Sequence, residues 1–353
     1  MARQARNMMK YIIKRILLMA PLLIGVLIIT WILSHMIDKN PYLSQLMTYD
    51  REFIERELSR VGWYKPWYEK LGLYLKNFFT GDWGESHFVW PGEKVVDVIA
   101  RVFPRTFELM IFSVLIVPII GIKLGISSAK NKNKSKDYFI RGMAIVGAGF
   151  PVFYIASLLQ IFVGLTLENF TYGGLDLPVV FANNPSLRLP VPSGGAGTGF
   201  RLIDSILYNE QIYFWDTLTH LVLPVFCMTF VSLSSITRQT RSSMLDVLDK
   251  DYIRTARAKG VKERDVIYKH ALRNGMLPSS HLIIGGIATS LIGSLFVEIT
   301  FNYTGMGYYF YSSLMLADYY LINGFIVFFT LIIISGTLTA DILYTIIDPR
   351  IIY

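Results

Sequence analysis

The segment Asp251-Tyr-Ile-Arg-Thr-Ala-Arg-Ala-Lys-Gly260, which continues to His270-Ala-Leu-Arg-Asn-Gly-Met-Leu-Pro278, is strongly basic and favours helix. It lies between an apolar run at 218–236 and another at 281–301. A protein that spans a membrane has little intrinsic reason to hold two short polar helices at the membrane face. We therefore expect another molecule to bind here, either a protein that receives a short helix in a groove or a surface of anionic lipid headgroups.

The boundaries of the two helices follow from their end residues. Asp251 is placed to cap a first helix that ends near Lys259, and Gly260 suits the left-handed residue that follows many helices. A second helix is expected over 262–275. Pro278 then opens the next apolar run at a position where its missing N–H carries no penalty.

The first of these helices has a candidate docking face. Tyr252, Thr255, Ala256 and Lys259 follow the i, i+3, i+4, i+7 spacing and are expected to lie on one side. The small side chains of Ala256 and Ala258 would allow a partner to approach closely.

Composition indicates a membrane protein. Of the 353 residues, 53% are hydrophobic and 17% are charged, whereas soluble domains carry about 25% charged residues. The apolar residues gather in six runs, each long enough to cross about 30 Å of hydrocarbon. We predict an all-α integral membrane protein with transmembrane helices at 11–37, 106–128, 139–165, 218–236, 281–301 and 321–347. Pro118 and Pro151 fall inside these spans, where neighbouring helices can satisfy the freed carbonyls.

The lysines and arginines give the orientation. The segments 1–15, 127–141, 237–280 and 348–353 hold 21 of the 34, although they are much shorter in total than the segments on the other side, which hold 12. The positive-inside rule then places the termini, 1–10 and 348–353, in the cytoplasm. Loop 237–280 is therefore expected to be cytoplasmic, and loops 38–105 and 166–217 external. The net charge of +8 follows this topology and does not indicate a nucleic-acid partner.

Several kinds of site are not expected. The single cysteine, Cys227, allows no disulfide framework, and five scattered histidines form no metal cluster. The chain contains no phosphate-binding loop motif and no catalytic constellation, so we expect neither a cofactor nor an ATPase site on it. In the first external loop, an amphipathic helix over 50–61, with Phe53, Ile54, Leu58 and Val61 on one face, is expected to cap the outer mouth or lie on the membrane interface.

Ionisable residues inside predicted spans are candidate functional groups. Glu298, late in the fifth span, is interpreted either as structural or as part of a translocation path. Structural roles are favoured for Glu108 and Lys123, which lie near opposite ends of the second span, for His220 at an interface, and for Asp341 near the end of the last span.

Small residues repeat along the fifth span. Gly285, Thr289 and Gly293 recur every four residues beside Gly286, Ser290 and Ser294. Such spacing lets helices pack closely. The partner helix is expected either within this subunit or in a second subunit along a pathway.

The order of motifs resembles a known family. Tyr252-Ile-Arg-Thr-Ala-Arg-Ala-Lys-Gly260, His270-Ala-Leu-Arg-Asn274 and Leu277-Pro278 look like the coupling loop of binding-protein-dependent ABC importer permeases. More narrowly, the chain is similar to the B-type permease of the oligopeptide/dipeptide/nickel branch. Further motifs agree over nearly the whole chain: Lys14-Arg15, Gly81-Asp-Trp-Gly-Glu-Ser86, Pro104-Arg-Thr-Phe-Glu-Leu109, Arg238-Gln-Thr-Arg241, Val297-Glu298 and Asp341-Ile-Leu-Tyr-Thr-Ile-Ile-Asp-Pro-Arg350.

The chain also departs from the family pattern. Arg254-Thr255-Ala256 stands where importer permeases in general have Glu-Ala-Ala, as is usual in the peptide branch. Tyr303-Thr-Gly-Met-Gly307 lacks a usual proline, and Gly275 replaces a usual alanine. Loop 166–217 matches poorly, which leaves the substrate class open.

The resemblance implies a type I ABC importer permease fold with a core domain at 106–350, in the cell membrane. It implies a homologous second permease, two cytoplasmic ATPase subunits that bind ATP and Mg, and an extracellular solute-binding protein. The solute would be an oligopeptide or dipeptide, or else nickel or an oligosaccharide. An ion-coupled carrier is the less favoured alternative, because it should show a central carboxylate and broken helices. The residues expected to couple to the ATPases are Tyr252, Arg254, Thr255, Ala256, Arg257, Ala258, Lys259, Gly260, His270 and Arg273.

Overall fold

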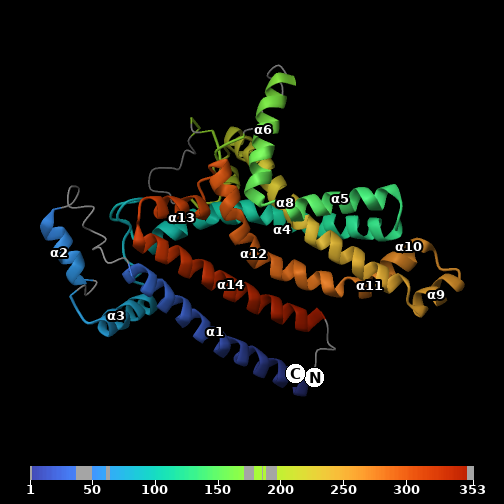
Figure 1. Cartoon of the computed structure of the whole chain (residues 1–353), viewed down its shortest axis with the longest axis horizontal. Helices are drawn as coiled ribbons and strands as arrows, with labels where there is room; N and C mark the ends of the chain where they lie inside the picture. The colour runs from blue at the N-terminus through green and yellow to red at the C-terminus, as the bar shows by residue number, and fades with distance from the viewer. Residues whose placement is uncertain are drawn as a thin grey trace. The chain divides into compact units, whose positions relative to one another are not determined.

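The computed structural model describes residues 2–36, 50–60, 64–170, 179–184, 186–187 and 197–347. These residues form helices (Figure 1). They also form one isolated bridge, between Glu85 and Lys94. The helices are α1 (Ala2–Met36), α2 (Arg51–Arg60), α3 (Trp67–Thr80), α4 (Val95–Lys130), α5 (Ser135–Gly149), α6 (Val152–Phe170), α7 (Arg201–Leu207), α8 (Gln211–Leu248), α9 (Asp251–Ala258), α10 (Glu263–Asp265), a π-helix (Val266–Ala271), α11 (Leu272–Gly275), α12 (Leu277–Phe301), α13 (Met306–Met315) and α14 (Tyr319–Ile347).

Most of the predicted spans correspond to long apolar helices. By length and composition, α4, α8 and α14 are each able to cross a membrane. The pair α5–α6 and the two halves of α12 each qualify when a bent pair is counted as one span. Helix α1 contains a shorter apolar stretch, Leu17–Ile32. The all-α membrane fold predicted from the sequence is therefore confirmed.

The third predicted span is not one continuous helix. Helix α5 ends at Gly149, α6 begins at Val152, and the two are bent by 110°. Phe150 is extended, with φ −103° and ψ 140°, because the ring of Pro151 disfavours helical geometry in the residue before it. Pro151 therefore lies at a break between two helices and not inside a continuous helix. Pro104, Pro118 and Pro224, by contrast, lie inside continuous helices.

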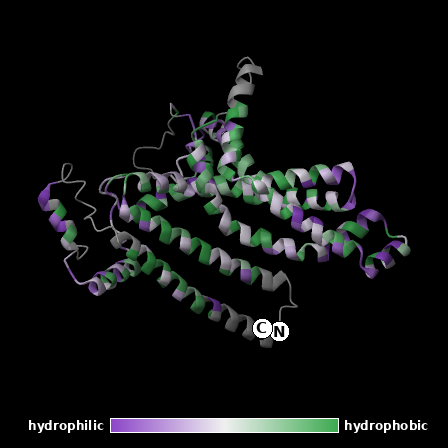
Figure 2. Ribbon diagram, viewed as in Figure 1, coloured by the Kyte–Doolittle hydropathy of each residue, from purple (hydrophilic) through white to green (hydrophobic). Residues whose placement is uncertain are grey.

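Two helices extend far beyond their predicted apolar runs. Helix α4 begins at Val95 instead of residue 106, and α8 covers 211–248 instead of 218–236. Hydropathy marks the part of a helix that suits the membrane, whereas the polar ends continue the same backbone hydrogen bonding. Figure 2 shows hydrophobic residues along much of α4 and α8 and hydrophilic residues gathered around α9 and α10.

The chain divides into two compact units, 1–103 with 308–335 and 104–307 with 336–353. In the second unit, helices α4, α6, α8 and α12 supply a buried apolar cluster that includes Leu109, Ala156, Met228 and Phe301. Glycines let the helices approach closely: a Cβ at Gly125 would lie 2.6 Å from the Cβ of Thr240. This packing fixes the positions of α4 and α8.

In the first unit, α1 packs against α3. The predicted amphipathic helix at 50–61 is present as α2, with Ile54 and Leu58 buried. Val61 of the same prediction lies outside the described residues.

Candidate functional site

The basic segment forms the predicted helix and turn. Helix α9 covers Asp251–Ala258, and Gly260 has a φ of +75°, the left-handed conformation expected of it. Asp251, however, is not the cap. Lys250 precedes the helix, and the Asp251 carboxylate instead lies 3.3 Å from Nη1 of Arg254. An acidic residue in the first turn still interacts favourably with the helix dipole.

One side of α9 is buried in the protein. Ile253 is fully buried and Ala256 is 9% exposed, in a cluster with Ile126 and Ala129 of α4 and Met244 of α8. The expectation that Ala256 faces a partner was therefore wrong, because a spacing of three places it beside Ile253. The other predicted coupling residues of this helix and turn are exposed: Tyr252, Arg254, Thr255, Arg257, Ala258, Lys259 and Gly260.

The second helix is not a regular α-helix. Its middle, Val266–Ala271, is a π-helix, flanked by the short α10 and α11. Val266, Ile267 and Ala271 are buried in the same cluster as Ile253. The wider π turn leaves residues 268–270 exposed in succession, including His270, and Arg273 is exposed one turn later. Single π turns within helices are frequent at functional sites.

Polar contacts hold the two helices together. Asn274 Nδ2 donates to the Tyr252 hydroxyl at 3.0 Å. Arg257 donates to both oxygens of Glu263, at 2.9 and 3.1 Å. The hydrogen bonds from Arg257 lower the pKa of the Glu263 carboxyl below its usual value. The exposed face is thus presented by a pair of helices that are fixed to each other.

A buried carboxylate, that of Asp137, links three helices of the second unit. Asp137, in the first turn of α5, is fully buried and accepts hydrogen bonds from Nε and Nη2 of Arg241, both at 2.8 Å. It also accepts the Ser128 hydroxyl and the Asn133 N–H. Helices α4, α5 and α8 are therefore linked at one point. Arg241 ends the motif Arg238-Gln-Thr-Arg241, but nothing in its local sequence indicates a partner 104 residues away.

The turn after α12, residues 302–307, is held by Glu298. This side chain is fully buried, and its Oε2 accepts the N–H of Gly307 at 2.7 Å. A Cβ at Gly305 would come within 2.5 Å of the same oxygen, and one at Gly307 within 2.5 Å of the α12 backbone. Thr106 Oγ1 accepts the Met306 N–H at 2.7 Å. The glycines of Tyr303-Thr-Gly-Met-Gly307 are thus required by close packing, and Glu298 makes a structural contact.

Two arginines meet at the same turn. Arg105 Nη1 donates to the carbonyl oxygen of Thr304 at 3.0 Å. Arg201 Nη2 donates to the hydroxyl of the same threonine, also at 3.0 Å. Glu108, near the start of the predicted second span, is buried and accepts the N–H groups of Arg201 and Leu202 at the start of α7. This part of loop 166–217 is therefore tied to α4.

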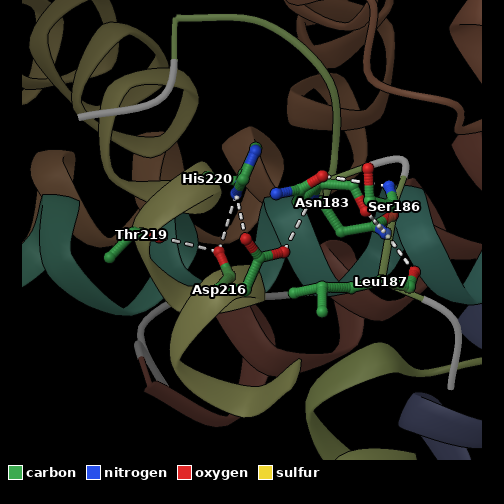
Figure 3. A network of polar contacts seen from close by, with 7 residues as sticks. Asn183, Ser186, Leu187, Asp216, Thr219 and His220 are labelled. Atoms are coloured by element: carbon green, nitrogen blue, oxygen red, sulfur yellow. Dashed lines mark hydrogen bonds and ion pairs between the residues drawn. The ribbon is translucent and has the colours of Figure 1, made fainter. Parts of the chain in front are cut away.

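Another part of the same loop is attached to the start of α8 (Figure 3). Asp216 Oδ2 accepts the N–H of Asn184 at 2.8 Å, and His220 Nδ1 lies 2.7 Å from the Asp216 carbonyl oxygen. His220 is buried within this network. Among the described residues, no group of three or more His, Cys, Asp or Glu could hold a metal.

The small residues of α12 lie on an open face. In the described part of the chain, nothing lies within 4 Å of a Cβ built at Gly285, Gly286 or Gly293. The hydroxyls of Thr289 and Ser290 donate to carbonyls of their own helix. Ser294 likewise donates to the Leu291 carbonyl of its own helix, but it differs from them in being buried. The helix that this spacing is expected to pack against, within this subunit or in a second one, therefore stays a prediction. Of the remaining predicted ionisable residues, Lys123 is exposed and Asp341 is half-buried.

Sequence reasoning missed Asp318, which is fully buried in the first unit. Its Oδ2 accepts the Ser86 hydroxyl at 2.6 Å and the N–H groups of His87, Phe88 and Val89 at 3.1, 3.0 and 3.2 Å. We call these four donors, residues 86–89, the Asp318 cradle. A usable signal existed: Asp318 is the only Asp, Glu, Lys or Arg in the sequence segment 302–320.

Comparison with known proteins agrees with the geometry. The chain is 35% identical over 349 residues to the dipeptide transport system permease protein DppB of Alkalihalophilus pseudofirmus, covering 98% of this chain and 100% of that protein. It is 34% identical over 351 residues to the oligopeptide transport system permease protein AppB of Bacillus subtilis, covering 98% and 100%. It is 32% identical over 352 residues to the dipeptide transport system permease protein DppB of Escherichia coli, covering 98% and 99%.

A family match covers the core of the chain. Residues 121–353 match the family described as the binding-protein-dependent transport system inner membrane component. The matched region includes α9, the π-helix and the turn after α12. The chain is therefore a membrane-embedded subunit that belongs to this family of transport permeases.

Proposed function

We propose that this chain and a homologous second permease form the membrane pathway of an importer for dipeptides or oligopeptides. An extracellular solute-binding protein would deliver the peptide, and two cytoplasmic subunits that bind ATP and Mg would drive the cycle. The peptide assignment rests on the named systems of the relatives, which are dipeptide and oligopeptide transport systems.

The observation that carries the mechanism is the two-sided character of α9. Tyr252, Thr255 and Lys259 are exposed, whereas Ile253 and Ala256 are packed against α4 and α8. A partner that pushes on the exposed side would therefore move the ends of two membrane helices directly. Such a movement is a rigid-body transition, and it requires ATP to bind the two states with different affinities.

The proposal includes an orientation and a pathway. The basic helical pair would face the cytoplasm together with both termini, as the lysine and arginine distribution favours. The open face of α12 at Gly285, Thr289 and Gly293 would pack against the second permease beside the pathway.

Replacing Gly260 with valine tests the coupling role. The left-handed conformation at φ +75° is strained for a β-branched residue, at about 1–2 kcal/mol, whereas Gly260→Asn is a matched control because asparagine tolerates this conformation. In the reconstituted complex, we expect Gly260→Val to insert normally but to lose both peptide uptake and the ATPase stimulation given by loaded binding protein. Normal stimulation in the valine variant would contradict the coupling role.

Substrate class needs a separate measurement. Proteoliposomes with the complete complex should accumulate labelled dipeptides or oligopeptides in an ATP-dependent manner, and nickel or oligosaccharides should not be accumulated. Accumulation of nickel without peptide would overturn the peptide assignment and leave the coupling mechanism intact.

A further inference from the structure

We propose that α3 is an interfacial helix, whose edge formed by Tyr68 and Phe79 inserts among the lipid headgroups beside the end of α1. The proposed partner is the bilayer surface itself. This inference does not depend on which solute is carried or on which side of the membrane α3 lies.

The position of α3 supports this partner. Helix α3 packs against α1, and the Tyr74 hydroxyl lies 3.2 Å from Oγ1 of Thr30. Thr30 lies near the end of the apolar stretch Leu17–Ile32. If that stretch lies in hydrocarbon, its last turn marks the depth at which hydrocarbon gives way to headgroups, and α3 is held at that depth.

The exposed side chains have the chemistry of a membrane interface. Trp67, Tyr68 and Phe79 are 67%, 59% and 66% exposed. Tyr68 and Phe79 are eleven residues apart, so a period of 3.6 residues brings them to the same edge of the helix. Aromatic residues, tryptophan and tyrosine above all, are enriched at membrane–water interfaces because their rings are apolar and their polar atoms can remain hydrated.

The opposite edge of α3 is polar. Glu69 and Thr80 each follow one of the aromatic residues and are turned by about 100° from it. Segment 64–80 carries Lys65, Lys70 and Lys76 against one acid, Glu69, which suits anionic headgroups. An amphipathic helix of this composition lies in the plane of the interface.

The neighbouring surface of α1 also indicates lipid as the occupant. Ile29 and Ile32, which flank Thr30, are 58% and 42% exposed. Exposed aliphatic side chains on a membrane helix are satisfied by acyl chains. The aromatic edge of α3, formed by Tyr68 and Phe79, therefore lies next to the end of the surface of α1 that would face acyl chains.

Spin labels at two matched pairs of positions test the proposal. Cys227 is the only cysteine in the sequence and is buried, so a cysteine added on α3 can be labelled selectively and the unmodified chain serves as the control. The variants are Tyr68→Cys with its neighbour Glu69→Cys, and Phe79→Cys with its neighbour Thr80→Cys. All four positions are exposed, so the fold should be retained.

The measurement is collision of each nitroxide with oxygen, which enters lipid, and with nickel ethylenediaminediacetate, which stays in water. The complete complex is reconstituted in vesicles of phosphatidylcholine and phosphatidylglycerol. We expect the ratio of oxygen to nickel accessibility to be higher at 68 than at 69, and higher at 79 than at 80. Equal ratios within both pairs would mean that α3 is surrounded by water and would overturn the proposal. An immobilised label at 68 and 79 that neither reagent reaches would mean that a protein covers the edge, and would overturn it equally.

Discussion

Replacing Asp318 with alanine should release the segment 86–90 from the rest of the first unit. The wild-type carboxylate is fully buried, and one of its oxygens accepts all four hydrogen bonds of the Asp318 cradle. Alanine would leave these four donors without their acceptor. The Ser86 hydroxyl also accepts the Trp90 N–H at 2.9 Å, so the effect should extend through that residue.

The expected magnitudes form an ordered series. A hydrogen bond to a charged group contributes about 1.5–3 kcal/mol. Ser86→Ala removes one such bond together with the bond that Ser86 Oγ accepts from the Trp90 N–H, and should therefore destabilise the closed segment by at least about 2 kcal/mol. Asp318→Ala removes all four; because such effects are not additive, we expect at least about 4 kcal/mol. Asp82→Ala is the matched control. Its carboxylate accepts one long bond, 3.3 Å from the Gly84 N–H, in an exposed position.

Hydrogen exchange at the amides of residues 87–89 measures the opening directly, because local opening free energies set the exchange rates of protected amides. About 2 kcal/mol corresponds to about 30-fold faster exchange. We expect that acceleration for Ser86→Ala, a much larger one for Asp318→Ala, and little change for Asp82→Ala. Wild-type exchange rates in Asp318→Ala would refute the reasoning, as would equal effects of Ser86→Ala and Asp318→Ala.

Three further predictions concern the second unit. Gly307→Ala places a Cβ within 2.5 Å of the α12 backbone and should reduce stability by about 1–3 kcal/mol, which a lower melting temperature would show. Gly142→Ala is the control, because nothing among the described residues lies within 4 Å of its Cβ, and it should leave the melting temperature unchanged. Arg241→Lys keeps the charge but loses the two-bond pairing with a buried carboxylate, so we expect a loss approaching about 3 kcal/mol; an unchanged melting temperature would contradict this. Arg257 lowers the pKa of the Glu263 carboxyl in the folded chain. The contribution of this ion pair to folding stability is therefore fully present above pH 4.5, the ordinary pKa of glutamate, and is lost as the pH falls through the lower pKa of the folded state. The wild-type chain should therefore lose slightly more stability on acidification than Glu263→Gln, by less than about 1 kcal/mol because the pair is exposed.

Local chemistry accounts for what the sequence predicted well. The positive φ at Gly260 and the start of α12 near Pro278 follow from backbone preferences of single residues. The apolar runs follow from the thickness of the bilayer. The break at Pro151 is also local, because a proline disfavours helical geometry in the residue before it, here Phe150.

Long-range polar contacts could not be predicted in the same way. Asp137 with Arg241 and Asp318 with Ser86 join residues 104 and 232 positions apart. Nothing in the local sequence of either partner specifies the other. Their pairing depends on how the helices pack. For Asp318, the isolated charge in the apolar segment 302–320 indicates that a partner must exist.

The burial of Ala256 bears on the proposed coupling role of α9. If Ala256 faced a partner, the exposed side of the helix would be the smooth, small-residue side. Instead, Ala256 and Ile253 contact the core, and the larger Tyr252 is 43% exposed on the other side. A small side chain on the inner face lets the α9 backbone lie close to α4 and α8, so under the proposed coupling role α9 would be a spacer only one helix thick. Because protein interiors are close-packed and hardly compressible, a displacement applied to the exposed side would pass through such a spacer with little loss.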